Sequence, residues 1–396
     1  RPIVEEISGR RLEALPERGL AGEDRLREVL REARRDDPLS ASLGPATQML
    51  LAEEARQVLA VYVMTEGRIY VSLEHLATNY AALLEPGREA DYLVPLMGHE
   101  LIHALDDRIH GFAAHAKGLE DPDSQQAFTA LYEGRAILAE EAIARRRGAG
   151  DVFERRFELL RTPPDDGRTP IFVRDLFAQN VLFPYVEGRA FVSWVVEHRG
   201  ARAVDDLLAD PPRTTAEVLD PGRRYDPPEV PEELGRIAPL LARVEERLGG
   251  EGWTLRRSAP TGKDLWFGLV GAPEEERRQV VRSLRGGTKL TLQSTKDPLT
   301  VFRAASLAVH ATPEAARAAV EAGRRAEAAK DETVGRAPGG LVQVIESTET
   351  PIALPAAAGY ARVRTYRVLS LEQRAYFAAA ACGRVVIEFA AANDTA

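Results

Sequence analysis

The chain has 396 residues, of which 44% are hydrophobic and 29% charged, and its formal net charge at pH 7 is −9. This ordinary composition excludes a globally disordered or fibrous protein, and the length favours two domains over one. No apolar run approaches the ~20 residues that span a bilayer, and the 52 lysines and arginines form no basic arm. We therefore expect neither a membrane span nor binding of nucleic acid. The single cysteine, Cys382, excludes an internal disulfide framework and a cysteine-based zinc cluster.

The N-terminal part of the chain is predicted to be mainly helical around one hairpin. Residues 1–56 are charged and amphipathic, which is typical of surface helices. Two β-rich runs at 58–64 and 68–73 flank a glycine turn, so they predict a β-hairpin. From 91 to 107 the apolar residues fall at helical spacing, and Pro95 suits the first turn of that helix.

A second long helix is predicted between the polar loop at 120–124 and Arg147, where Gly148 provides a stop. Further helical patterns occur at 152–160 and 190–198. Proline and glycine then accumulate from 210 to 231, which predicts a loop that is longer than an ordinary connector.

Beyond residue 250 strand-like runs alternate with two helical stretches. The predicted strands are 265–270, 290–293, 299–309, 341–345, 361–369 and 385–389, and the predicted helices are 274–284 and 313–329. We therefore expect an α+β protein with two domains. Residues 1–250, with a core at 58–227, form a mainly helical domain with a small sheet, and residues 255–396 form a smaller α+β domain.

The strongest chemical signal is the H-E-x-x-H motif formed by His99, Glu100 and His103. Histidines four positions apart share one face of a helix, so both imidazoles can bind one metal ion. Glu100 lies beside that face, where a carboxylate can take a proton from water bound to the metal. The competing interpretation is a solvated helix face that carries two unrelated histidines.

A catalytic zinc site uses three protein ligands, so a third must come from elsewhere in the chain. His110 lies one residue beyond the position that an extended H-E-x-x-H-x-x-G-x-x-H motif would require. Glu133 follows His103 by thirty residues on the second long helix, which a loop of about fifteen residues lets fold back antiparallel on the first. We predict Glu133 as the third ligand, with Glu140, Glu141 and His110 as alternatives.

Residues 99–107, followed by 131–136, resemble a group of bacterial zincin-type metallopeptidase homologues with the pattern HELVHALQDQ and then L-x-EGDA. Residues 183–192 are similar to that group's FPY-x-x-G-x-x-FV segment, and 211–221 to its PP-x-ST-x-x-x-L-x-P loop. The resemblance covers about residues 58–227. It implies a gluzincin fold with a small sheet, an active-site helix and a glutamate helix, and a zinc-dependent hydrolase of unspecified substrate.

Two positions depart from the pattern. Arg135 stands where the group has the aspartate of EGDA, and Ile137 stands where thermolysin-like enzymes carry an aspartate that supports a zinc ligand. Loss of such a supporting carboxylate costs about 10- to 100-fold in metal affinity or activity. Asp106 and Asp107 are candidates to replace it, although both also suit a solvated helix end.

The predicted reaction is the hydrolysis of a peptide bond with Zn²⁺ as cofactor and Glu100 as general base. Tyr185 is the first candidate for the hydroxyl that stabilises the oxyanion, followed by His198 and Tyr225. A core aromatic role is the competing interpretation of Tyr185. In zincin-like architecture an edge strand above the active-site helix binds the extended substrate. We assign five further residues to the core or the surface: His75, His115, Phe191, Trp194 and His310.

The alternative function is a zincin-derived binding or assembly module that holds a metal with little or no hydrolysis. Arg135 and the added C-terminal domain favour it, whereas the intact Glu100 argues against it. The expected partners are a peptide or protein substrate and a protein bound through residues 255–396. Because the chain begins with Arg1 and such peptidases are commonly exported, we expect a bacterial envelope or extracellular location, with the cytoplasm left open.

Overall fold

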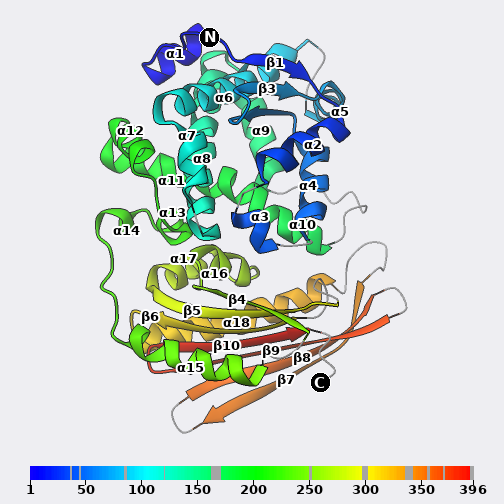
Figure 1. The fold of residues 1–396 in the computed structure, drawn as a ribbon, viewed down its shortest axis with the longest axis vertical. Helices are drawn as coiled ribbons and strands as arrows, with labels where there is room; N and C mark the ends of the chain where they lie inside the picture. Colours follow the sequence, from blue (N-terminus) through cyan, green and yellow to red (C-terminus); the bar gives the residue numbers. More distant parts are fainter. Residues whose placement is uncertain are drawn as a thin grey trace. The chain divides into compact units, whose positions relative to one another are not determined.

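The computed structural model describes all residues except 36–37, 44–45, 84–86, 120, 162–170, 249–251, 297–301, 335–341, 355–356, 369–370 and 393–396 (Figure 1). It is a mixed α/β structure with a three-stranded and a seven-stranded sheet. The chain divides into two compact units, Arg1–Pro221 and Gly222–Ala396. This division lies earlier in the chain than the boundary that we placed near residue 250. Among the helices that the structure describes, none has the length and apolar character needed to cross a bilayer.

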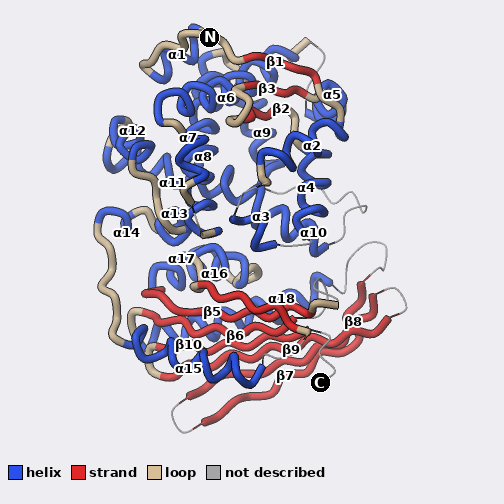
Figure 2. Tube along the Cα trace, in the orientation of Figure 1, coloured by secondary structure: helices blue, strands red, loops and turns tan. Residues whose placement is uncertain are grey.

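The first unit consists mainly of helices (Figure 2). They are α1 (Pro2–Ser8), α2 (Glu23–Ala33), α3 (Pro38–Leu43), α4 (Ala46–Gln57), α5 (Leu73–Leu83), α6 (Glu89–His110), α7 (Phe112–Lys117), α8 (Pro122–Arg146), α9 (Gly150–Arg161), α10 (Ile171–Phe177), η1 (Ala178–Leu182), α11 (Phe183–Arg199), α12 (Arg202–Ala209) and α13 (Thr215–Leu219). The η1 element is a π-helical segment that joins α10 to α11.

A small sheet packs against α6. The predicted hairpin is confirmed, since β2 (Ala60–Val63) and β3 (Arg68–Val71) pair antiparallel. β1 (Glu17–Leu20), which the sequence did not predict, adds to β3 in parallel. Tyr62 and Ile69 of this sheet form a hydrophobic cluster with Ala104 of α6. One edge of the sheet is therefore fixed next to the helix that carries the H-E-x-x-H motif.

α6 and α8 form an antiparallel pair at the centre of the first unit. Gly98 of α6 lies next to Ile143 of α8, and His103 of α6 lies next to Glu133. Residues later in α6 therefore meet residues earlier in α8, so the two helices are antiparallel. α6 is longer than predicted, and Pro95 lies inside it rather than in its first turn. The N-cap of α8 is Asp121, whose carboxylate accepts hydrogen bonds from two backbone amides of the first turn.

α8 also contacts α11 at a glycine crossing. A Cβ atom on Gly134 would lie 2.2 Å from the carbonyl oxygen of Gly188, so the two backbones approach more closely than any side chain permits. Gly134 directly follows Glu133 in the sequence. The crossing therefore helps to fix the helix face on which Glu133 lies, and it gives the 183–192 segment a packing role.

The segment at 211–221 is anchored to the first turn of α8. Thr215 donates from its hydroxyl and its backbone amide to the carboxylate of Asp123. Thr214 caps α13 by accepting a hydrogen bond from the backbone amide of Glu217. The stretch that we predicted to be rich in loops, 210–231, also contains two short helices, α13 and Gly222–Tyr225, and these capping and anchoring contacts stabilise the first of them.

The second unit places helices on a sheet. Its elements are α14 (Gly222–Tyr225), α15 (Glu233–Leu248), β4 (Trp253–Ser258), α16 (Gly262–Gly268), α17 (Glu274–Ser283), β5 (Leu284–Ser294), β6 (Phe302–His310), α18 (Pro313–Val334), β7 (Val342–Leu354), β8 (Ala357–Val368), β9 (Leu371–Cys382) and β10 (Val385–Ala392). β4, β9 and α15 were not predicted. The predicted strand ends at 299, 341 and 369 lie outside the described residues.

The predicted strand at 265–270 was wrong, because residues 265–268 belong to the helix α16, which begins at Gly262. Thr261 accepts a hydrogen bond from the backbone amide of Asp264, and the Asp264 carboxylate accepts one from the backbone amide of Thr261. This capping box pairs two amides that the first turn leaves free, so it favours α16 over an extended conformation.

The seven strands are antiparallel in the order β4-β5-β6-β10-β9-β8-β7. Neighbouring residues on β6 point to opposite faces. Leu307 and Val309 pack with Ile237 of α15, whereas Ala308 packs in the cluster that contains Ala316 of α18. Each face of the sheet thus has its own helix, and α15 belongs to the second unit because it completes the core on β5 and β6.

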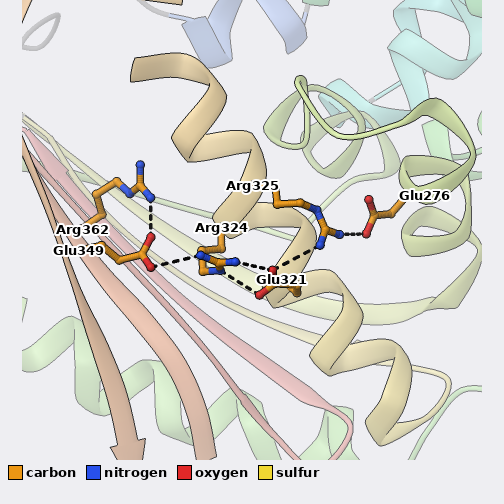
Figure 3. A network of polar contacts seen from close by, with 6 residues as sticks. All are labelled: Glu276, Glu321, Arg324, Arg325, Glu349 and Arg362. Carbon is orange, nitrogen blue, oxygen red and sulfur yellow. Dashed lines mark hydrogen bonds and ion pairs between the residues drawn. The ribbon is translucent and has the colours of Figure 1, made fainter. Parts of the chain in front are cut away.

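A chain of ion pairs links α17, α18 and the β7–β8 hairpin (Figure 3). Arg324 lies 2.7 Å from Glu321 on the same helix and 3.4 Å from Glu349 of β7. Glu349 also pairs with Arg362 of β8, and Arg325 pairs with Glu276 of α17. These contacts tie one helix to the sheet and to the next helix.

Candidate metal centre

The side chains of His99, His103 and Glu133 converge between α6 and α8. The Nε2 atoms of the two histidines are 2.9 Å apart, and Oε2 of Glu133 lies 3.2 Å from each of them. Each residue therefore presents one donor atom to a shared point, and these three residues form a possible metal-binding triad. The structure brings together the three residues that we predicted as ligands.

The donor set and its spacing fit a small divalent ion. A tetrahedral zinc ion about 2.0–2.1 Å from nitrogen and oxygen ligands spaces those ligands roughly 3.3 Å apart. The three observed separations are 2.9–3.2 Å. The two imidazoles are 3% exposed, so the positive charge would lie in a region largely screened from water.

The pKa values of the triad reflect strong mutual attraction. Burial opposes the charged form of Glu133, but the neighbouring His103 and hydrogen bonds to both imidazoles hold its pKa well below the usual range. Burial also lowers the pKa of His99, yet hydrogen bonds with Glu133 and Glu140 outweigh it and raise the pKa to about 10. Glu133 therefore stays ionised and provides a negatively charged donor beside the two imidazoles.

Glu100 lies beside the triad and is 4% exposed. Burial raises its pKa, although the two nearby histidines partly offset this effect. The backbone amide of Tyr62 on β2 hydrogen bonds to its carboxylate, while Oε2 has no hydrogen-bond partner among the described residues. A buried carboxylate with a raised pKa and a free oxygen is suited to accept a proton.

Glu140 lies on the other side of His99 from the triad. Its Oε2 is 3.3 Å from Nδ1 of His99, and its Oε1 accepts a hydrogen bond of 2.6 Å from Arg156 of α9. Glu140 thus contacts a ligand residue rather than the shared donor point. Glu141, the next residue, instead pairs with Arg145 and Arg189.

Arg135, the residue that departs from the EGDA pattern, forms an ion pair with Asp106 of α6. Its Nε donates a hydrogen bond of 2.6 Å to Asp106, which is fully buried. Asp107 accepts a hydrogen bond of 3.0 Å from the hydroxyl of Tyr62. Asp106 and Asp107 therefore support the packing of α6 against α8 and against the small sheet, and neither has a described hydrogen bond to His99 or His103.

Two tyrosines flank the imidazoles. The ring of Tyr132 stacks on His103 with centroids 3.7 Å apart, and the ring of Tyr185 stacks near His99 with centroids 6.1 Å apart. Burial, with Glu133 and Glu100 nearby, raises the pKa of both hydroxyls well above the usual value. Both therefore stay protonated and can donate. Tyr132 was missed at the sequence level, although its position directly before Glu133 was a usable signal.

The remaining candidates are not members of the triad. His198 is on the exposed end of α11, where Nδ1 lies 2.9 Å from the carbonyl oxygen of Trp194. Tyr225 belongs to the second unit. His110 stacks on Phe112 at the end of α6. Four of the residues assigned to structure lie as follows: His75 is buried with Nδ1 2.8 Å from the Val58 carbonyl oxygen, His115 stacks on Phe128, Phe191 is buried in α11, and His310 is buried on β6.

Comparison with known proteins gives no relative. No model of a known protein family matches the chain, and no curated protein or solved structure matches it either. The interpretation of the site therefore depends on its own geometry and on the chemistry of its residues.

Proposed function

We propose that this protein is a zinc-dependent peptide hydrolase of the gluzincin type. The observation that carries the proposal is the convergence of three donor atoms from His99, His103 and Glu133, with the unpaired carboxylate oxygen of Glu100 beside them. The small sheet against α6, and α8 running antiparallel to it, agree with the architecture that the motif resemblance implies.

Zinc is the ion that best suits this donor set. Two imidazole nitrogens and one carboxylate oxygen are a common ligand set of catalytic zinc, which keeps a fourth position open. Zinc bound there would make water more acidic and polarise a carbonyl group. Glu140 already pairs with Arg156, whereas no described ion pair joins Glu133 to an arginine or a lysine, so a divalent ion at the triad would balance the charge of Glu133.

The chain's own residues would then carry the proton and orient the substrate. Glu100 takes the proton of the attacking water and passes it to the leaving amine. Tyr185, kept neutral by its raised pKa, donates a hydrogen bond to the oxygen that becomes negatively charged. The backbone amide of Tyr62 on the edge strand β2 hydrogen bonds to Glu100, so this strand lies beside the proposed base.

The test is metal analysis together with hydrolysis of casein and of a peptide library by the wild type and by Glu100→Gln. We expect the variant to retain the metal and to lose about 10²- to 10⁴-fold in hydrolysis, because proton transfer is its only missing function. Glu141→Gln serves as a matched control, since Glu141 pairs with arginines outside the triad. Undiminished hydrolysis in Glu100→Gln would contradict the assignment of the base.

A second candidate is a binding or assembly module with a structural metal. The burial of His99, His103 and Glu100 favours it, because a peptide must reach a catalytic ligand set. Structural zinc sites are closed, whereas catalytic ones keep an accessible position. Zinc bound at one ion per chain, with no hydrolysis by the wild type or by Glu100→Gln, would support this module, and the second unit would then be the natural site for a protein partner.

A further inference from the structure

The imidazole of His99 lies between two carboxylates of the same helix. Oε2 of Glu133 is 3.2 Å from its Nε2, and Oε2 of Glu140 is 3.3 Å from its Nδ1. Residues seven positions apart lie on one face of an α-helix, two turns from each other. α8 therefore contacts both nitrogens of this one ring.

The chemistry of a metal ligand decides which nitrogen carries the proton. An imidazole binds a metal through an unprotonated nitrogen. The other ring nitrogen carries the proton and donates a hydrogen bond to a neighbouring acceptor. Nε2 of His99 faces the triad, so the proton belongs on Nδ1. Oε2 of Glu140 lies 3.3 Å from Nδ1, and no other described residue has a hydrogen bond to this nitrogen.

Glu140 is itself held in place. Arg156 of α9 donates a hydrogen bond of 2.6 Å to Oε1 of Glu140, and the side chain of Glu140 is 2% exposed. The positive charge of Arg156 stabilises the buried carboxylate, so Glu140 can remain ionised and accept a hydrogen bond from the Nδ1–H group of His99. Three helices, α6, α8 and α9, thus contribute to one chain of contacts that ends at His99.

We infer that Glu140 is a positioning residue that fixes the tautomer and ring orientation of His99 for metal binding. This inference rests on the metal site proposed above. It assigns to Glu140 the support that Ile137 cannot provide. Asp106 does not compete for the role, since it is paired with Arg135.

The experiment measures the affinity of the full-length protein for Zn²⁺ by competition with a chromophoric chelator, and the absorption spectrum of bound Co²⁺. The variants are Glu140→Gln, Glu140→Asp and the matched control Glu141→Gln. Glu140→Asp keeps a negative charge near Arg156, but its shorter side chain moves the carboxylate away from Nδ1. This variant remains informative if Glu140→Gln does not fold. Unfolding in excess chelator shows whether each metal-free variant is folded.

We expect both Glu140 variants to bind Zn²⁺ about 10- to 100-fold more weakly and to change the Co²⁺ spectrum, with Glu141→Gln within twofold of the wild type. Folded Glu140 variants with wild-type affinity and an unchanged Co²⁺ spectrum would overturn this inference alone. A wild-type protein that binds neither metal would instead overturn the proposed site itself.

Discussion

The two units organise charged residues in opposite ways. In the first unit, Glu100 and Glu140 beside His99 are buried, Glu133 is 12% exposed, and one oxygen of Glu100 has no hydrogen-bond partner among the described residues. In the second unit, the network of Figure 3 joins three glutamates to three arginines, and Arg324 is 41% exposed. Charges that pair with one another need no ligand, whereas donor atoms that converge without such pairing can bind one. The comparison therefore favours the first unit as the place to test for a metal ion.

The largest predicted loss of stability compares a buried with an exposed ion pair in the second unit. Glu327 of α18 forms a buried ion pair with Arg364 of β8, and both side chains are at most 10% exposed. Glu327→Ala leaves the arginine buried without this partner, so we expect a loss of about 3–5 kcal/mol in the free energy of unfolding. Urea denaturation measures it.

Arg324→Ala is the matched variant in the exposed network. Water and salt screen its ion pairs, so the expected loss is below about 1 kcal/mol and shrinks in about 1 M salt. Equal losses for the two variants would show that burial does not decide the value of an ion pair in this unit.

Zinc addition could break the comparison between the units. If the triad binds zinc only when folded, free zinc at a 1,000-fold excess over its Kd stabilises the protein by about 4 kcal/mol. Thermal unfolding with zinc and with a chelator measures the shift. His103→Ala, which lacks one donor, should not respond. If the wild type responds no more than His103→Ala, the buried cluster is no metal site.

The next prediction concerns the pH dependence of stability that arises from His310, a buried histidine on β6. Burial and the nearby charge of Arg285 lower its pKa to about 4, and Ser283 lies 2.7 Å from Nδ1. Between pH 6.5 and 4 the unfolded chain therefore binds a proton at His310 that the folded chain does not. Stability should fall as the pH falls through this range, by on the order of 3 kcal/mol from this residue.

Replacement by asparagine removes the titrating group. Urea denaturation of wild type and His310→Asn at pH 7 and pH 4.5 should show a smaller acid-induced loss in the variant. Parallel losses in the two proteins would contradict the lowered pKa of His310.

The last prediction concerns the packing that supports the triad. Gly134→Ala introduces a Cβ atom against the backbone of Gly188, and overpacking of this kind costs about 1–3 kcal/mol. Gly235→Ala in α15 is the control, because nothing lies within 4 Å of its Cβ position. It should be neutral or stabilising, since alanine favours a helix by about 0.5–1 kcal/mol. Gly134→Ala should also weaken metal binding, because Glu133 is its neighbour. Equal stability of the two variants would argue against a tight crossing.

Part of the candidate site could be predicted without the fold. The four-residue spacing of His99 and His103 dictates that they share a helix face, whatever surrounds the helix. The choice of Glu133 over Glu140 and Glu141 depended instead on the expected fold-back of a second helix, and only the contacts between α6 and α8 show which carboxylate meets both Nε2 atoms. The seven-residue interval from Glu133 to Glu140 was a signal that both acids lie on one face, and it was not used.

The sequence by itself determined the local elements: the β2–β3 hairpin around its glycine turn, the helical periodicity of α6 and the i, i+4 pair that this helix carries. Only the tertiary structure decided the contacts between elements. Arg156 approaches Glu140 from another helix, and α8 has a close approach to α6 at Gly98 and another to α11 at Gly134. Backbone geometry sets spacing within a helix, whereas side-chain packing across the whole unit sets which atoms of two helices meet.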